Sequence, residues 1–280
     1  MTPLTVLRSN GQATTDYLLI EPRLVEDATF LHLQGHPLAQ NFHEERSALY
    51  TIDDLSERDD RFNALHTAWF HQLELDQPVR RALQEYPSLQ EATQNCLVCR
   101  AEIQRVQGAD LHVAPSGASQ IESTNRTLVV RLCAETFSNS TRLLGLLRHE
   151  FMHISDMLDP DFGYRPDLAP AGTEPGRRHL FSERYRVLWN ITVNGRLARR
   201  GQLLEEAGAV HRDEFERVFS MLDERLDSCY RWFYERDRPT HRSLAEFSLK
   251  PVEAADRTPV AGSRISDRPA GSEPSAPSPR

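Results

Sequence analysis

The segment Arg148-His149-Glu150-Phe151-Met152-His153 contains the pattern H-E-x-x-H. In an α-helix, residues four positions apart lie on the same face, so His149 and His153 can present two imidazoles to one ion. Glu150 stands beside the first histidine, where a carboxylate can take a proton from a water molecule on the metal. The segment therefore predicts a zinc-binding helix, with His149 and His153 as ligands and Glu150 as general base.

The residues on either side of this motif predict a helix over residues 140–158. Apolar side chains recur at helical spacing away from the two histidines, at Leu143, Leu147, Ile154 and Leu158. Ser138 and Ser140 are candidate N-caps, and the dipeptide Asp159-Pro160 disfavours further helix. Gly145, one turn before the motif, is expected to leave room on the metal face. The alternative is a surface helix with incidental histidines.

Short β-strands are expected before this helix. Residues 127–133 are rich in β-branched side chains and are bounded by polar turns, and Leu111-His112-Val113 is short and extended. Segments 17–20 and 29–33 are further candidate strands. A strand on the rim of a cleft can bind the backbone of a substrate by strand addition.

Helices are expected over most of the remaining chain. They are predicted within residues 57–107, with a break at Pro87 and a last helix over 89–106, and again over 179–193 and 202–236. Asn194-Gly195 is a stop signal for the helix over 179–193. Cys96 and Cys99 are interpreted as two small residues on the helix over 89–106, in preference to half of a zinc site or a redox pair.

The composition predicts a protein of the cytoplasm. The net charge of −8 argues against nucleic acid as a partner, and no apolar run is long enough to span a membrane. No early segment resembles a signal peptide, and the four cysteines do not suggest a disulfide framework in a chain of 280 residues. The oligomeric state cannot be deduced from these features.

Three regions are expected. Residues 1–110 are predicted as a largely helical N-terminal region, and residues 111–247 as the catalytic domain with C-terminal helices. Residues 248–280 are rich in Pro, Ser, Ala and Gly, and a segment with few large apolar residues cannot offset the entropy lost on ordering. They are predicted as a disordered tail. The predicted fold class is α+β, with a small mixed sheet packed on the H-E-x-x-H helix.

A catalytic zinc usually takes three protein ligands, so a third ligand is expected besides the two histidines. The chain offers four candidates for it, all of which follow the motif. Glu183 has apolar neighbours a turn away on either side, and a carboxylate on such a face needs a partner. Asp156 shares the helical face of the histidines, but a straight helix rarely brings three side chains to one tetrahedral ion. It is expected to orient a histidine. Asp159 suits a helix that breaks early, and His179 lies one turn before Glu183.

The motif, followed by a glutamate on the next predicted helix, resembles the gluzincin group of zincin metallopeptidases. In that group the first helix supplies two histidines and the base, and the second supplies the glutamate. The resemblance implies that His149, His153 and Glu183 bind Zn²⁺ and that Glu150 is the base. A pairing of Glu183 with a nearby arginine is the alternative. The resemblance covers about residues 127–195, and its zincin-like fold is an expectation.

The resemblance also implies an oxyanion-stabilising side chain. A tyrosine or histidine has this role in many members of the group, and Tyr164, His179 and Tyr185 are candidates. The expected function is zinc-dependent hydrolysis of a peptide or protein substrate. A metal amidohydrolase acting on another amide, and a non-catalytic interaction protein stabilised by a metal, are the alternatives.

Overall fold

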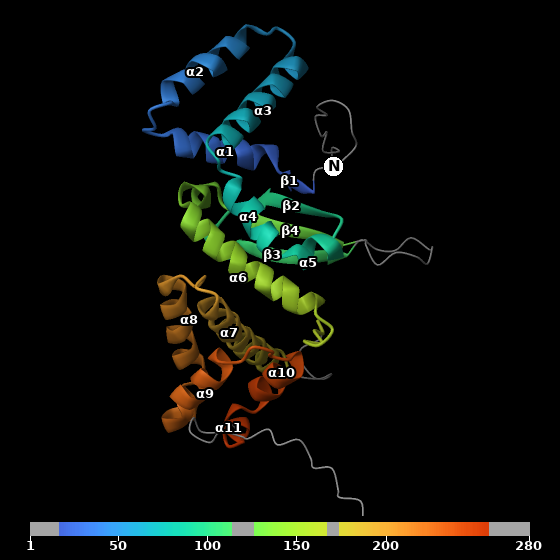
Figure 1. Ribbon diagram of the computed structural model, residues 1–280, viewed down its shortest axis with the longest axis vertical. Coiled ribbons are helices and arrows are strands. Elements are labelled where there is room, and N and C mark those ends of the chain that lie inside the picture. Colours follow the sequence, from blue (N-terminus) through green and yellow to red (C-terminus); the bar gives the residue numbers. More distant parts are fainter. Residues whose placement is uncertain (1–16, 114–125, 167–173, 258–280) are drawn as a thin grey trace, which may run out of the picture. The chain divides into compact units, whose positions relative to one another are not determined.

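A computed structural model describes residues 17–113, 126–166 and 174–257 of the chain (Figure 1). The chain divides into two compact units. The first comprises residues 1–166 and 197–208, and the second comprises residues 167–196 and 209–280. The described residues are mostly helical and include a four-stranded mixed sheet, so the predicted α+β class is confirmed.

The sheet lies in the first unit and has the strand order β1-β2-β4-β3. Its strands are β1 (Leu18–Ile20), β2 (Asn95–Arg100), β3 (Gly108–Val113) and β4 (Arg126–Leu132). β1, β2 and β4 are parallel, whereas β3 is antiparallel to β4 and forms an edge of the sheet. The predicted boundary at residue 110 therefore falls inside β3. Residues before 110 share the sheet with β4 and do not form a separate helical region.

One face of the sheet is buried and the other is half-exposed. Side chains alternate along β2 and β4, and the register aligns Cys96 with Leu128 and Val98 with Val130. These four side chains are fully buried, whereas Leu97 and Cys99 on the opposite face are only partly buried. This period of two is what places alternate residues of a strand on opposite faces.

The sheet also corrects the interpretation of the two nearby cysteines. Cys96 and Cys99 lie on β2, not on a helix, because α5 (Pro87–Ala92) ends early and the chain continues as a strand. Residues three apart on a strand point to opposite faces, so the two thiols do not converge on one ion. Burial raises the pKa of Cys96 to about 12, which keeps this thiol protonated at neutral pH.

The first unit also contains helices that pack beside the sheet or against one another. They are α1 (Pro22–Leu33), α2 (Ala39–Ala48), α3 (Leu55–Gln72), α4 (Gln77–Glu85) and α6 (Ser140–Leu158), with short 3-10 turns at Leu49–Thr51, Gln104–Val106 and Ala134–Ser138. The strand predicted at residues 17–20 is confirmed as β1. The prediction of a strand over residues 29–33 is wrong, because these residues belong to α1. Leu33, Phe42 and Trp69 form a small core between α1, α2 and α3.

Helix α6 occupies the range predicted from the sequence. Asn139, rather than either predicted serine, caps it by accepting the Arg142 N–H at 2.9 Å. The helix ends before the Asp159-Pro160 dipeptide, as expected. Figure 1 shows α6 running alongside β3. The space expected over Gly145 is filled, because a Cβ there would lie 2.4 Å from Leu204 Cδ1.

The second unit is helical. It contains most of α7 (Pro175–Arg199) and α8 (Glu205–Val218), and also α9 (Leu226–Tyr234), α10 (His241–Leu249) and α11 (Pro251–Ala255), with a 3-10 segment at Ser220–Arg225. Its core includes an aromatic cluster in which Phe247 contacts Phe219 and Phe233, with ring centroids 5.8 and 4.8 Å apart. Among the apolar side chains of residues 202–236, those of Phe215, Val218, Phe219, Leu222 and Phe233 are buried.

Two sequence-based boundaries in the second unit were wrong. Helix α7 continues through Asn194-Gly195, because Gly195 permits a close approach of the Tyr234 backbone and does not end the helix. The predicted tail begins too early, since α10 runs to Leu249 and α11 follows it with Pro251 and Ala255 buried. The part of the tail from 258 to 280 lies outside the described residues.

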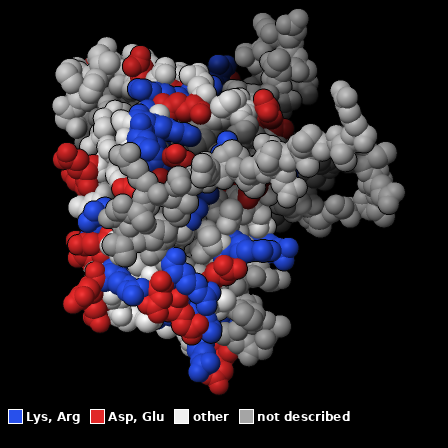
Figure 2. Space-filling model, turned by 60° about the horizontal axis from the view of Figure 1, so that its bottom comes forward, with Lys and Arg blue, Asp and Glu red and all other residues white. Residues whose placement is uncertain are grey.

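The surface of the described chain carries both signs of charge. Figure 2 shows basic and acidic side chains interspersed on one face. In the second unit, Arg225 pairs with Asp256 at 2.6 Å, and Arg212 pairs with Glu216 at 2.5 Å.

None of the helices in the described parts of the chain has the length and apolar character that a membrane span requires.

The packing at Gly195 generates a prediction for stability. A Cβ at this position would lie 1.7 Å from the Tyr234 carbonyl oxygen, a backbone atom that cannot move alone. Gly195→Ala should therefore lower the free energy of unfolding by at least about 2 kcal/mol. Gly176→Ala is the matched control, because it lies on the same helix with no atom within 4 Å of a Cβ there. Chemical denaturation measures both, and equal stability of the two variants would contradict the close contact.

Candidate metal centre

Two imidazoles lie side by side on α6. His149 and His153 are one turn apart, and their ring centroids are 4.8 Å apart. The His149 side chain is 13% exposed, so it is largely shielded while still reached by solvent. The helix therefore brings together the pair of histidines that the sequence predicts.

The carboxylate of Glu150 lies between this pair and the edge of the sheet. Its Oε1 is 3.4 Å from His149 Nδ1, and its Oε2 accepts the backbone N–H of Ala109 at 3.1 Å. The side chain is 24% exposed. Because Ala109 belongs to β3, the edge strand itself fixes one oxygen of the predicted base. This backbone donor carries no signal in the sequence.

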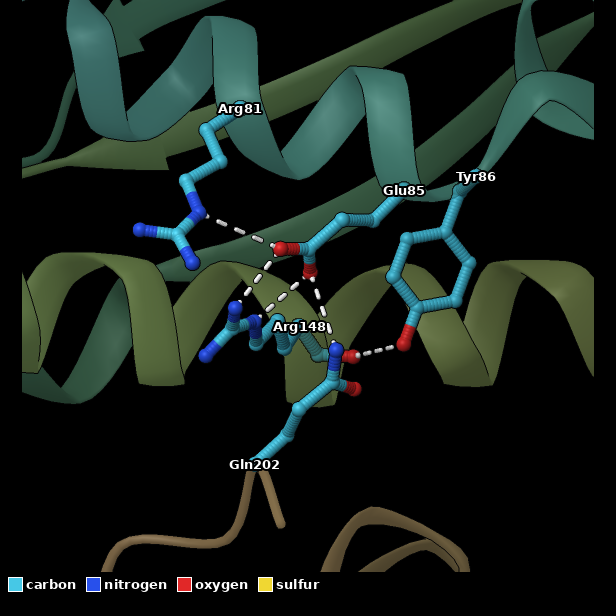
Figure 3. A network of polar contacts seen from close by, with 5 residues as sticks. All are labelled: Arg81, Glu85, Tyr86, Arg148 and Gln202. Atoms are coloured by element: carbon cyan, nitrogen blue, oxygen red, sulfur yellow. Dashed lines mark hydrogen bonds and ion pairs between the residues drawn. The ribbon is translucent and has the colours of Figure 1, made fainter. Parts of the chain in front are cut away.

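A cluster of polar contacts anchors α6 immediately before His149 (Figure 3). Arg148 donates to both carboxylate oxygens of Glu85 on α4, at 2.6 and 2.7 Å. The Tyr86 hydroxyl donates to the Arg148 carbonyl at 3.0 Å, and Gln202 donates to Glu85 at 3.4 Å. The hydrogen bonds from Arg148 hold the pKa of Glu85 below its ordinary value, although burial opposes them. The carboxylate therefore stays ionised at neutral pH, and the pair is maintained.

Of the three candidate oxyanion donors, Tyr164 is in the same unit as the histidines and near β3. Burial raises the pKa of the Tyr164 phenol, and the negative charge of Asp110 on β3 adds to this rise. A tyrosine with a raised pKa remains protonated at neutral pH and can donate a hydrogen bond. Its neighbour Asp110 pairs with Arg131 at 2.5 Å.

The other two candidates lie on α7 in the second unit. Tyr185 is 2% exposed, and its hydroxyl is 2.8 Å from His241 Nδ1 in the interior of that unit. Its ring also packs against Trp189. These contacts give Tyr185 a structural role. His179 is exposed near the start of α7.

The proposed third ligand, Glu183, also lies on α7 in the second unit. Its carboxylate is 3.3 Å from the guanidinium of Arg217 on α8, so Glu183 does pair with an arginine, one on another helix. The Arg217 side chain is 65% exposed, and such exposed ion pairs contribute little to stability. This weak ion pair does not exclude Glu183 as a zinc ligand, and that assignment stays a prediction.

The two aspartates near the end of α6 differ in environment. Asp156 is buried, 5% exposed, and lies on the helical face of the histidines. Asp159 is exposed at the C-cap and accepts the Asp161 N–H at 2.9 Å. Because α6 continues to Leu158 and does not break after His153, the early break that would favour Asp159 as a ligand is missing.

The side chains on α6 belong to the chemical types that bind zinc. Neutral imidazoles and carboxylates are common zinc ligands, and His149 and His153 lie as a pair with a carboxylate beside them. Within the residues that the structure describes, no group of three His, Cys, Asp or Glu side chains forms a metal site. The pair on α6 is therefore the part of the predicted centre that the fold brings together.

Comparisons with known proteins add no family to this picture. No protein-family model, curated protein or solved structure matches the chain.

The histidine pair generates a prediction for metal content. Protein purified without chelators should carry about one zinc per chain, and His149→Ala and His153→Ala should each lose it, because the ligands that remain rarely hold the ion. Elemental analysis measures the zinc content. His112→Ala, which changes an exposed histidine on β3, is the control and should retain zinc. Full zinc content in both α6 variants would rule out the site.

The ligand assignment at Glu183 can be separated from its ion pair. Glu183→Ala should weaken zinc binding severely. Asp156→Ala should lower zinc affinity by roughly ten- to a hundredfold, the usual effect of losing a hydrogen bond that orients a ligand. Arg217→Met removes the partner but keeps the carboxylate, so zinc affinity should be retained. Competitive titration against a chelator ranks the variants. A larger loss in Asp156→Ala than in Glu183→Ala would exclude Glu183 as the ligand.

Proposed function

We propose that this protein is a zinc-dependent hydrolase that acts on peptide bonds. The observation that carries the proposal is the arrangement on α6, where two imidazoles lie 4.8 Å apart with the Glu150 carboxylate beside them. His149 and His153 would hold the ion, and Glu183 is the third ligand that the gluzincin resemblance implies. A zinc ion there would supply a Lewis acid and lower the pKa of a water molecule.

The chain's own residues would then handle the proton and the developing charge. Glu150 Oε2 is held by the Ala109 N–H, which leaves Oε1, on the side of His149, to accept a proton from the attacking water. The same carboxylate would return the proton to the leaving amine. Tyr164, a phenol that is protonated at neutral pH, would donate to the carbonyl oxygen as negative charge develops.

The edge strand favours a peptide over another amide. Among the described strands, β3 pairs only with β4. Backbone groups alternate in direction along an antiparallel strand, and the Ala109 N–H points away from β4 towards Glu150. The Leu111 N–H therefore also points off the edge, where an extended peptide can pair with it. A small non-peptide amide would make no use of this edge.

The proposal keeps the gluzincin-like arrangement that the sequence predicts. A small mixed sheet lies beside the H-E-x-x-H helix, and its edge strand contacts Glu150, the proposed base. The alternative of a non-catalytic metal site requires a closed set of four protein ligands. The partly exposed Glu150 favours a site with an open position.

Exchange of the carboxylate for an amide tests the proposed base. Glu150→Gln should retain zinc and the fold, but it should lose at least about a hundredfold in cleavage rate, because the amide cannot accept the proton. Substrates are found by comparing peptide ends in a proteome digest treated with the wild type or the variant. Glu44→Gln, an exposed carboxylate on α2, is the control and should cleave normally. Equal cleavage by Glu150→Gln and wild type would remove Glu150 from the mechanism.

A further inference from the structure

The start of strand β3 is held on more than one side. The Gln107 side chain accepts the Cys133 N–H at 2.9 Å and the Thr136 hydroxyl at 2.6 Å, which ties the residue to the turn that precedes α6. Gly108 lies opposite Arg131 in the ladder with β4. Ala109 donates to Glu150 at 3.1 Å. Residues 107–109 are therefore linked to the sheet, to the turn before α6 and to α6 itself.

Gly108 is the point where a side chain would interfere with this arrangement. A Cβ at this position would lie 3.2 Å from Glu150 Oε2, which is closer than most Cβ contacts, and at an ordinary 3.7 Å from the carboxylate carbon. Its φ of +154° is also a conformation that other residues rarely adopt. The missing side chain lets the carboxylate reach the strand backbone.

We infer that residues Gln107–Ala109 are a positioning element for Glu150, in which the Ala109 N–H orients the carboxylate and Gly108 leaves the space that it occupies. This inference rests on the proposed function for its catalytic consequence. The contact itself depends only on the fold.

The arrangement links the base to the edge of the sheet. A carboxylate held by a flexible side chain could rotate independently of the substrate. Glu150 is instead held by the backbone of β3, the strand to which an extended peptide would pair. A shift of β3 therefore moves the base and the peptide together. Because the Ala109 N–H is engaged by Glu150, the next outward N–H available for pairing on β3 is that of Leu111.

The experiment compares two glycine variants and one removal of the acceptor. Gly108→Ala places a methyl group against Glu150. Gly35→Ala is the matched control, because Gly35 also has a positive φ, +75°, but no atom lies within 4 Å of a Cβ there. Any effect that Gly108→Ala and Gly35→Ala share is attributed to backbone strain. Glu150→Ala removes the acceptor of the Ala109 N–H and leaves β3 unchanged in sequence.

The first measurement does not need activity. In full-length ¹⁵N-labelled protein as purified, the Ala109 amide proton should move upfield and exchange with solvent at least about tenfold faster in Glu150→Ala. Gly108→Ala should move it in the same direction, and Gly35→Ala should not. An Ala109 amide with unchanged shift and exchange in Glu150→Ala would overturn the inference, even if Gly108→Ala did not fold.

The second measurement tests the catalytic consequence. With the best-cleaved peptide from the proteome digest, Gly108→Ala should lower kcat by at least about tenfold with zinc content unchanged, because a misplaced catalytic group costs rate. Gly35→Ala should keep the wild-type kcat. Equal kcat in both glycine variants would overturn the positioning role. A wild type that cleaves no peptide would instead refute the proposed function, and the amide measurement would still decide whether Ala109 holds Glu150.

Discussion

The bidentate ion pair between Arg148 and Glu85 fixes α6, the helix that carries the candidate site. Both charges are largely shielded, and the guanidinium fork meets both carboxylate oxygens. Such charge-assisted bonds constrain rotation, because turning α6 about its axis would leave one charge without its partner. Since Arg148 directly precedes His149, the same constraint sets the direction in which both histidines point. The Tyr86 hydroxyl adds a bond to the helix backbone at the same residue.

A second set of contacts holds α6 against the edge of the sheet. Glu150 bonds to the Ala109 backbone, and the absence of a side chain at Gly108 allows this approach. Leu204 packs against Gly145 one turn before the motif. The helix is therefore fixed by an ion pair on the α4 side and by a backbone hydrogen bond on the β3 side. A general base gains most from such rigidity, because its efficiency depends on its distance to the proton.

The second unit contains the carboxylate that the sequence predicts as a third zinc ligand. Its helix α7 carries Glu183, and the pairing of this carboxylate with Arg217 offers an alternative to metal binding. The Arg217 side chain is 65% exposed, and such exposed ion pairs contribute little to stability. Tyr185, by contrast, is committed to His241 in the core of this unit.

The sequence by itself determined the helix over residues 140–158 and the histidine pair on it, because helical periodicity and four-residue spacing are local properties. It also predicted the strand over 127–133, whose β-branched residues mark a buried strand. Tertiary structure decided the features that depend on contacts between distant residues, which local sequence patterns do not encode. Cys96 and Cys99 joined a strand because β1 and β4 flank them, and Gly195 continued a helix because Tyr234 packs against it. The bonds from Ala109 to Glu150 and from Arg148 to Glu85 join residues 41 and 63 positions apart, and only packing brings such distant groups together.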